Sequence, residues 1–294
     1  MDQEARAQTK AAIEIVAPAE QTAALVFSSP HSGRDYPEEF LAASRLDPLA
    51  IRRSEDAFVD ELFGDVAHCG APLLKALFPR AYIDPNREPY ELDPAMFAER
   101  LPDWVNTRSP RVAAGLGTIA RLVANGAEIY RERLAFAEAA ERVEGLWRPY
   151  HAALEDLIAQ TRRQFGYCVL IDCHSMPSVA GPMEDDAGSR RRVDIILGDG
   201  HGTSCSRTLS DLVADTLAGL GYSVTRNAPY SGGFITRHYG RPRRGVHALQ
   251  IEINRALYMD ESRLERGARL ATVAADMRTL AGSLAAAGAG AVAA

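Results

Sequence analysis

Hydrophobic residues along the chain gather in short runs, which are separated by longer segments with helical periodicity. Two of the runs, Tyr167–Ile171 and Val193–Leu197, are largely apolar on both alternating faces, as in strands that helices cover from both sides. We expect six strands: Ala24–Phe27, Ala81–Ile83, Tyr167–Ile171, Val193–Leu197, Tyr222–Thr225 and Ala248–Ile253.

The segments between and after these runs predict helices. The expected helical segments are Ile51–Ala67, Arg131–Gln164, Cys205–Leu220 and Asp260–Leu284. Asp260 is placed to cap the N-terminus of the last one. Strand and helix alternation of this kind predicts an α/β fold, with a mostly parallel mixed sheet sandwiched by helices.

No linker or internal repeat divides the chain, so we expect a single domain over residues 1–294. The stretch Glu88–Ala114 has several prolines and little periodicity, which predicts a long loop of the kind that is often functional. The tail 285–294 contains only Ala and Gly apart from one Val, and we expect it to fray.

Composition narrows the classes of protein. The 294 residues are 47% hydrophobic and 24% charged, which suffices for a sizeable core, and the net charge of −6 argues against nucleic acid as the main partner. No apolar run approaches the ~20 residues that span a membrane. The polar N-terminus, Met1–Lys10, does not have signal-peptide form, and the four cysteines form no CxxC pair. We therefore expect reduced thiols and a cytoplasmic protein.

Two predicted strands end in histidines. His31 follows ALVFSSP, and His174 follows YCVLIDC. Taken alone, each histidine could equally be a structural residue at a loop or strand end that hydrogen-bonds to the backbone, and not a metal ligand. Together, at the carboxyl edge of one sheet, they indicate a zinc site, which needs a third ligand and leaves a fourth position for water. Glu55 and Asp56 are the candidate carboxylates, with surface acids on a helix as the alternative.

Further polar groups follow or interrupt predicted strands. Asn86 and Arg87 lie in the turn-like sequence DPNR, where a guanidinium suits a carboxylate of the substrate. Glu252 alternates with apolar residues in HALQIEIN, and a carboxyl among apolar neighbours should have the raised pKa that a general base needs, although a solvent-facing strand would alternate in the same way. Asn254-Arg255 repeats the dipeptide Asn86-Arg87.

The glycine-rich, basic segment 227–244 predicts a loop that closes over an anionic substrate, with an exposed loop without a role as the alternative. Its candidates for substrate contact are Arg237 and Arg241, with His238 and Arg244 beside them. A GxSxG elbow and a GxGxxG loop are both absent, which counts against a serine hydrolase of the α/β type and against a nucleotide site.

Taken in order, several motifs resemble the N-formylglutamate amidohydrolase family, over about residues 25–262. They are PHSG, SEDAFVDELF, FPRAYIDPNREPYELDP, IDCHSMP, DIILGDGHGTSCS and GGFITRHYGRP…HALQIEINRALYMDE. The resemblance implies a single-domain fold like that of zinc carboxypeptidases and aspartoacylases. It also implies hydrolysis of N-formylglutamate to formate and glutamate, the closing step of one histidine-degradation route.

Residue by residue, the resemblance implies zinc ligands at His31, His174 and Asp56, with Glu55 as the alternative to Asp56. It also implies substrate contacts from Asn86 and Arg87 and a catalytic role for Glu252, with Arg255 as a further substrate contact. One position departs from the pattern. Aspartoacylases and carboxypeptidases have Glu in a His-x-x-Glu motif where this chain has Arg34.

The sequence thus predicts one zinc per chain, Glu252 as the base, and Arg87 as the group that holds the substrate carboxylates and the oxyanion. Asp172 is expected to orient a ligand histidine. The alternatives are a related metallo-amidohydrolase for another N-acyl amino acid, a non-catalytic binding protein on the same scaffold, and metal-free catalysis by Cys173 or Ser175.

Overall fold

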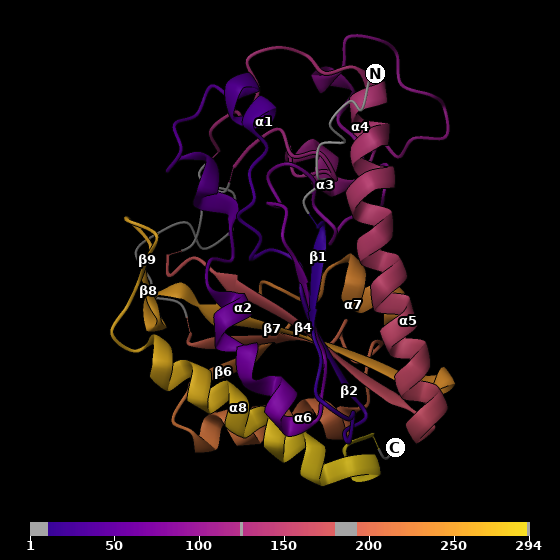
Figure 1. The fold of residues 1–294 in the computed structure, drawn as a ribbon, viewed down its shortest axis with the longest axis vertical. Helices are drawn as coiled ribbons and strands as arrows, with labels where there is room; N and C mark the ends of the chain where they lie inside the picture. Colours follow the sequence, from indigo (N-terminus) through magenta and orange to yellow (C-terminus); the bar gives the residue numbers. More distant parts are fainter. Residues whose placement is uncertain (1–10, 124–125, 180–192, 293–294) are drawn as a thin grey trace, which may run out of the picture.

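The computed structural model describes residues 11–123, 126–179 and 193–292. A seven-stranded mixed sheet runs through the molecule in the order β1-β3-β2-β4-β7-β5-β6 (Figure 1). The strands are β1 (Ile13–Val16), β2 (Leu25–Ser29), β3 (Leu73–Ala76), β4 (Cys168–Met176), β5 (Ile195–Gly198), β6 (Val224–Arg226) and β7 (Val246–Asn254). β1 pairs antiparallel with β3 and β5 pairs antiparallel with β7, while the other neighbours are parallel.

Helices cover both faces of the sheet. One face packs against α2 (Val59–Leu62), α6 (Arg207–Gly219) and α8 (Leu270–Ala287). The other face packs against α4 (Phe136–Arg142), α5 (Arg148–Phe165), α7 (Phe234–Tyr239) and irregular chain between residues 78 and 134. Figure 1 shows α5 on one side of the sheet and α6 and α8 on the other. This is the expected single α/β layered architecture.

The strands β4 and β7 form the longest pair at the centre of the sheet. All nine residues of each strand are buried, the polar ones included. The parallel register pairs His174 with Glu252 and Asp172 with Gln250. Because side chains alternate along a strand, these four polar residues lie on one face of the sheet.

One of the predicted strands does not form. Ala81–Ile83 is not a strand: it lies in a turn in which the Tyr82 and Ile83 amides donate to the carbonyl of Pro79. The true strand of this region is β3, which ends before the Pro79 that prevents its continuation. Neither β3 nor the edge strand β1 was expected from the sequence.

The predicted helix Ile51–Ala67 is interrupted. A 3-10 helix ends at Ser54, Glu55 and Asp56 are non-helical, and α2 begins only at Val59. Phe58, just before α2, has φ 66°, a left-handed conformation that breaks a right-handed helix. The break frees Asp56 to approach the sheet.

The end of the chain also differs from expectation. Asp260 caps no helix, since it lies in the hairpin formed by β8 (Met259–Asp260) and β9 (Glu265–Arg266), and α8 begins at Leu270. The helix continues to Ala287, and a 3-10 helix (Gly288–Val292) follows it with Ala291 buried. Residues 1–10, which argued against a signal peptide, and the last two residues of the tail lie outside the described residues.

Smaller helical features lie between these elements, among them a π-helix and two short α-helices. A π-helix over Val143–Trp147 joins α4 to α5 within the segment expected to be helical. The short helices α1 (Glu38–Ala43) and α3 (Pro110–Ala113) lie in the irregular part, and α3 interrupts the expected long loop Glu88–Ala114. No helix among the described residues is long and apolar enough to span a bilayer.

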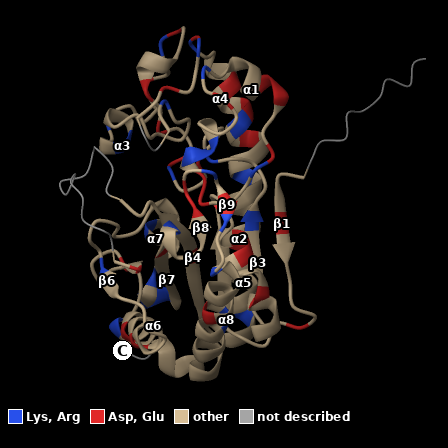
Figure 2. Ribbon diagram, turned by 90° about the vertical axis from the view of Figure 1, so that its left-hand side faces the viewer, with Lys and Arg blue, Asp and Glu red and all other residues tan. Residues whose placement is uncertain are grey.

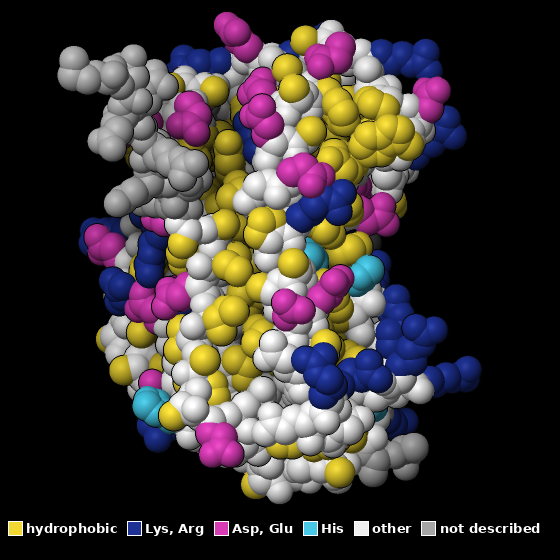
Figure 3. Space-filling model, turned by 45° about the vertical axis from the view of Figure 1, so that its right-hand side comes forward, with side chains coloured by type: hydrophobic (Ala, Val, Ile, Leu, Met, Phe, Trp, Pro, Cys, Tyr) yellow, Lys and Arg dark blue, Asp and Glu magenta, His cyan; other side chains and the backbone are white. Residues whose placement is uncertain are grey.

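Charged residues of both signs are spread over the molecule. Figure 2 shows acidic and basic segments interspersed, and Figure 3 shows mixed charges on one face, with a group of hydrophobic side chains near its top. Trp104 is the most exposed large hydrophobic residue of the described chain, at 63%.

Candidate metal centre and substrate cavity

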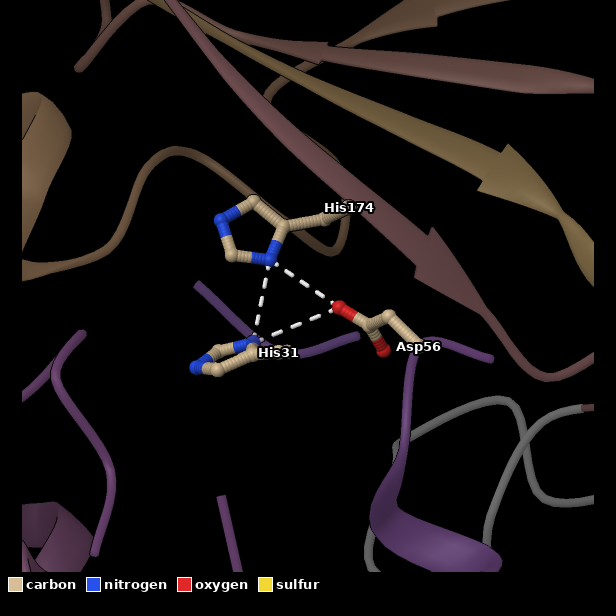
Figure 4. A group of neighbouring side chains, drawn as sticks. All are labelled: His31, Asp56 and His174. Atoms are coloured by element: carbon tan, nitrogen blue, oxygen red, sulfur yellow. Dashed lines mark hydrogen bonds and ion pairs between the residues drawn. The ribbon is translucent and has the colours of Figure 1, made fainter. Parts of the chain in front are cut away.

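His31, Asp56 and His174 meet above the sheet with their donor atoms facing one another (Figure 4). His31 follows β2, Asp56 lies in the helix break, and His174 lies on β4. The Nδ1 atoms of the two histidines are 3.1 Å apart, and Oδ2 of Asp56 lies 3.3 Å from Nδ1 of His31 and 3.1 Å from Nδ1 of His174. All three side chains are almost fully buried.

A carboxylate orients each histidine from behind. Nε2 of His31 lies 2.7 Å from Oδ1 of Asp84, and Nε2 of His174 lies 3.0 Å from Oδ1 of Asp172. Because a carboxylate only accepts, the Asp84 contact requires a proton on Nε2 of His31, which makes Nδ1 the ring atom that a cation would take. The Asn86 amide nitrogen, which only donates, also lies 3.1 Å from Nε2 of His174, so this atom has a donor and a carboxylate as neighbours.

Asp56 is held as an anion. Burial opposes its charge, but hydrogen bonds from His174 and His31 and the charge of Arg80 place the pKa of Asp56 well below its usual range. Its second oxygen, Oδ1, accepts from Arg255 at 2.9 Å and lies 3.8 Å from Arg80. Arg255 therefore fixes the orientation in which Oδ2 faces the histidines.

The cluster also favours a positive charge on its histidine side. Burial lowers the pKa of His174, but the carboxylates of Asp172, Asp56 and Glu252 outweigh it and raise that pKa well above its usual value. Two imidazole nitrogens and a carboxylate oxygen are typical zinc ligands. The three residues thus fit a divalent cation in their donor atoms, in their separation and in the charge around them.

Glu55, the alternative ligand, faces elsewhere. Its carboxylate accepts from Arg52 at 2.8 and 3.0 Å and from the Tyr36 hydroxyl at 2.8 Å. Arg34, at the position where related folds have a ligand glutamate, lies 3.4 Å from Glu61 and is 43% exposed. Of Glu55, Asp56 and Arg34, only Asp56 lies beside the two histidines.

Glu252 lies beside the cluster on β7, directly across from His174. Burial is the main reason that the pKa of Glu252 is raised to about 7; the positive charge on His174 lowers it, and Asp56 raises it further. The Gln250 amide donates to Oε1 of Glu252 at 2.9 Å. A carboxyl with this pKa can accept and return a proton near neutral pH.

The turn Asp84-Pro85-Asn86-Arg87 forms one wall of the site. Asn86 Oδ1 accepts from the Ile235 amide at 2.8 Å, and Arg87 donates to the backbone carbonyls of Leu116 at 2.9 Å and Asn86 at 2.7 Å. Burial lowers the pKa of Arg87 to about 10, where the guanidinium is still charged at neutral pH.

Two aromatic residues of the π-helix region hold the turn from outside. The Trp147 indole donates to the Arg87 carbonyl at 3.0 Å, and Nε2 of His151 lies 2.8 Å from the Pro85 carbonyl. A π-helix often marks a functional site, and here it brings Trp147 to this turn. No sequence motif marks Trp147 or His151 as part of the site.

A cavity of about 420 Å³ opens onto the cluster. Among its lining residues are His31, Asp56, His174, Glu252, Asn86, Arg87 and Arg255, so most of the predicted site residues share one cavity. Arg80 and Arg111 also line it and were not predicted. Arg80 lies in the recognisable motif FPRAYIDPNR, whereas Arg111 lies in irregular chain without a sequence signal.

Arg237 and Arg241 do not line this cavity. Both are exposed; Arg237 donates to Ser231 at 3.2 Å, and Arg241 donates to the backbone of residues 237 and 240. The neighbouring segment Pro229–Gly233 does line the cavity, so the loop reaches the site through these uncharged residues instead of its arginines.

Comparison with known families identifies the chain. The family model of N-formylglutamate amidohydrolase matches residues 23–259, which include the whole cluster and the strand that carries Glu252. The chain belongs to the N-formylglutamate amidohydrolase family. Enzymes of this family hydrolyse an amide bond, and this chain is a hydrolase of that kind.

Relatives of the family are similar over most of their length. N-formylglutamate deformylase of Pseudomonas aeruginosa is 32% identical over 241 residues, covering 81% of this chain and 82% of the relative, and that of Pseudomonas putida is 29% identical over the same shares. The crystal structure of N-formylglutamate amidohydrolase from Ralstonia eutropha JMP134 is 36% identical with a TM-score of 0.88, covering 94% of this chain and 98% of that one. A protein from Agrobacterium tumefaciens with 20% identity and a TM-score of 0.61 shares the fold, over 94% of this chain and 95% of that one.

Proposed function

We propose that this enzyme hydrolyses N-formyl-L-glutamate to formate and L-glutamate, with one zinc ion held by His31, Asp56 and His174. The observation that carries the proposal is the meeting of these three donors at a cavity that is also lined by Glu252 and several arginines. The names of the two Pseudomonas relatives and of the Ralstonia protein support this substrate.

Zinc bound by these residues would polarise the formyl carbonyl and activate water for attack. The chain's own residues have separate tasks. Asp84 and Asp172 hold the Nε2 sides of the two histidines, so that Nδ1 of each ring faces Asp56, and Arg255 holds Asp56. Arg255 then acts mainly through Asp56 and only secondarily as a substrate contact.

Glu252 is the proposed base. It takes the proton of the attacking water and delivers it to the nitrogen of the departing glutamate, which leaves as an amine. Its burial supports this role, because a carboxyl with a pKa of about 7 transfers protons in both directions near neutral pH. Arg87 and Asn86 bind the substrate, with Arg87 holding its carboxylates and adding a positive charge to the cavity that favours the developing oxyanion.

We further propose that the reaction takes place in the cytoplasm and closes a histidine-degradation route, as the family resemblance implies. The four cysteines are free thiols, consistent with a reducing compartment. Hydrolysis of a different N-acyl amino acid is the second candidate, because a cavity of about 420 Å³, a size typical of small-molecule sites, would serve another acyl amino acid through the same cluster.

The decisive experiment combines metal analysis with formate release before and after chelation. About one zinc per chain with chelator-sensitive release from N-formylglutamate would support the proposal. Bound zinc with turnover of other N-acyl amino acids only would establish the second candidate. Metal-free protein with chelator-resistant activity would overturn the metal site and restore the nucleophiles Cys173 and Ser175.

A further inference from the structure

Arg111 lines the cavity and has no hydrogen-bonding or ionic partner for its side chain among the described residues. It lies on the short helix α3 and is exposed. An arginine that lines an enzyme cavity without a counter-ion is available to an anionic ligand.

Local hydrogen bonds fix the place of Arg111 relative to Arg87. The Leu116 amide donates to the Arg111 carbonyl at 2.8 Å, and the Leu116 carbonyl accepts from Nε of Arg87 at 2.9 Å. Ser109 caps α3 by accepting from the Val112 amide at 3.0 Å. These bonds tie the backbone that carries Arg111 to the Arg87 side chain.

The other arginines of the cavity already have partners. Arg80 bonds to Asp84 at 2.8 Å and Arg255 bonds to Asp56 at 2.9 Å. Arg87 donates to two backbone carbonyls, and its nearest carboxylate oxygen, on Asp84, is 3.8 Å away. Glu252 is the remaining carboxylate of the lining, and it bonds to Gln250 instead.

Arg87 and Arg111 also repel each other. After burial, the charge of Arg111 is the leading cause that lowers the pKa of Arg87 to about 10, and Asp84 opposes it. Two guanidinium groups that line one cavity and repel each other, with one lacking any counter-ion in the described chain, favour an anion bound between them.

We propose that Arg111, together with Arg87, binds the side-chain carboxylate of the substrate and makes the site selective for acidic acyl amino acids. This inference rests on the proposed function. The α-carboxylate is one carbon from the reacting amide nitrogen and stays near the cluster, whereas the side-chain carboxylate reaches farther. The Arg111 side chain makes no hydrogen bond to His31, Asp56 or His174. It is therefore suited to the side-chain carboxylate, which lies farther from the reacting amide than the α-carboxylate does.

Nearby apolar residues support this placement. Ala114, Leu116 and Leu122 belong to the same wall of the cavity as Arg111. They offer an apolar surface to the methylene groups that separate the two carboxylates of glutamate.

The test compares Arg111→Gln with Arg108→Gln, assayed on N-formylglutamate and on N-formylglutamine. Arg108 is an exposed arginine on the same loop that does not line the cavity, so its replacement makes the same change in charge. We expect Arg111→Gln to lower kcat/KM for N-formylglutamate by about 10-fold or more, because a hydrogen bond between charged groups is lost. N-formylglutamine should change less than about 2-fold, and Arg108→Gln should match the parent on both.

Equal losses on the two substrates, or no loss on either, would overturn the role of Arg111. Titration with L-glutamate and L-glutamine separates this outcome from a failure of the proposed reaction, since binding needs no turnover. Weaker binding of L-glutamate alone in Arg111→Gln would support the inference even if the parent enzyme released no formate. Unchanged L-glutamate binding would overturn it.

Discussion

Glu252 lies directly beside His174 in the parallel pair of β4 and β7. The proposed base and a proposed metal ligand therefore project from the same face of the sheet at the same level, and the base reaches a molecule bound to the cluster. Rigid central strands hold both residues, which favours a fixed distance between proton acceptor and reacting group.

Replacing Glu252 with Gln should abolish most turnover while leaving the cluster intact. The amide keeps the shape of the side chain but accepts no proton, so we expect kcat to fall by about 10²- to 10⁴-fold. Metal content, measured on the same sample, should equal that of the parent enzyme. Near-normal turnover in this variant would show that another group is the base.

Asp56→Asn and Glu55→Gln form a matched pair of adjacent replacements. Asp56→Asn should lose bound metal and activity, because it removes an anionic ligand and leaves Arg255 without its partner. Glu55→Gln should keep its metal and lose only stability, by about 1.5–3 kcal/mol, since the Arg52 and Tyr36 bonds lose their charged acceptor. Metal analysis and denaturant unfolding of both variants check this, and the opposite pattern would make Glu55 the ligand.

The pH dependence should report Glu252. A base must be deprotonated to act, so kcat/KM should rise with pH through the Glu252 pKa of about 7, or somewhat lower when a bound cation favours the carboxylate. Gln250→Met removes a donor to the charged form, which should move this acidic limb upward by about 0.5–1 unit. A limb that stays in place would mean that Glu252 does not control it.

Gly233 leaves room for Asn86. A Cβ at position 233 would lie 2.3–2.5 Å from the Asn86 amide group, which hydrogen bonds to Ile235 hold in place. Gly233→Ala should therefore displace Asn86 and lower kcat/KM by about 10- to 100-fold. In Gly282→Ala, in the middle of α8, the new Cβ meets nothing within 4 Å, and the variant should be fully active and more stable by about 0.5–1 kcal/mol. If the two variants were equally active, Asn86 would not be needed for substrate binding.

The strand-end histidines could be predicted because buried apolar strands have a clear sequence pattern and their carboxyl ends share an edge. Asp56 was harder to predict, since its neighbours follow helical spacing, whereas in the structure the extended Glu55 and the left-handed Phe58 break that helix on either side of it. The pairing of Asp84 with His31 joins residues 53 positions apart, and no local pattern encodes it.

Sequence patterns also misplaced arginines in two ways: they favoured those of the segment 227–244, which do not line the cavity, and they missed Arg111, which does. A basic segment between glycines resembles a substrate lid, yet Arg237 and Arg241 face solvent. Arg111 has no motif around it, and tertiary contacts through Leu116 bring it to the cavity. Strand and helix patterns specify layers, whereas the direction of a loop side chain depends on contacts far away in the chain.

The position of β7 in the chain has a consequence for biosynthesis. His31, Asp56 and His174 leave the ribosome well before Glu252 and Arg255, yet β4 is enclosed in the sheet only when β7 pairs with it. A nascent or truncated chain that stops before Val246 carries every proposed ligand and lacks the base. It also lacks Arg255, which orients Asp56, so the metal position and the base are both completed only after β7 and the residues that follow it have been made.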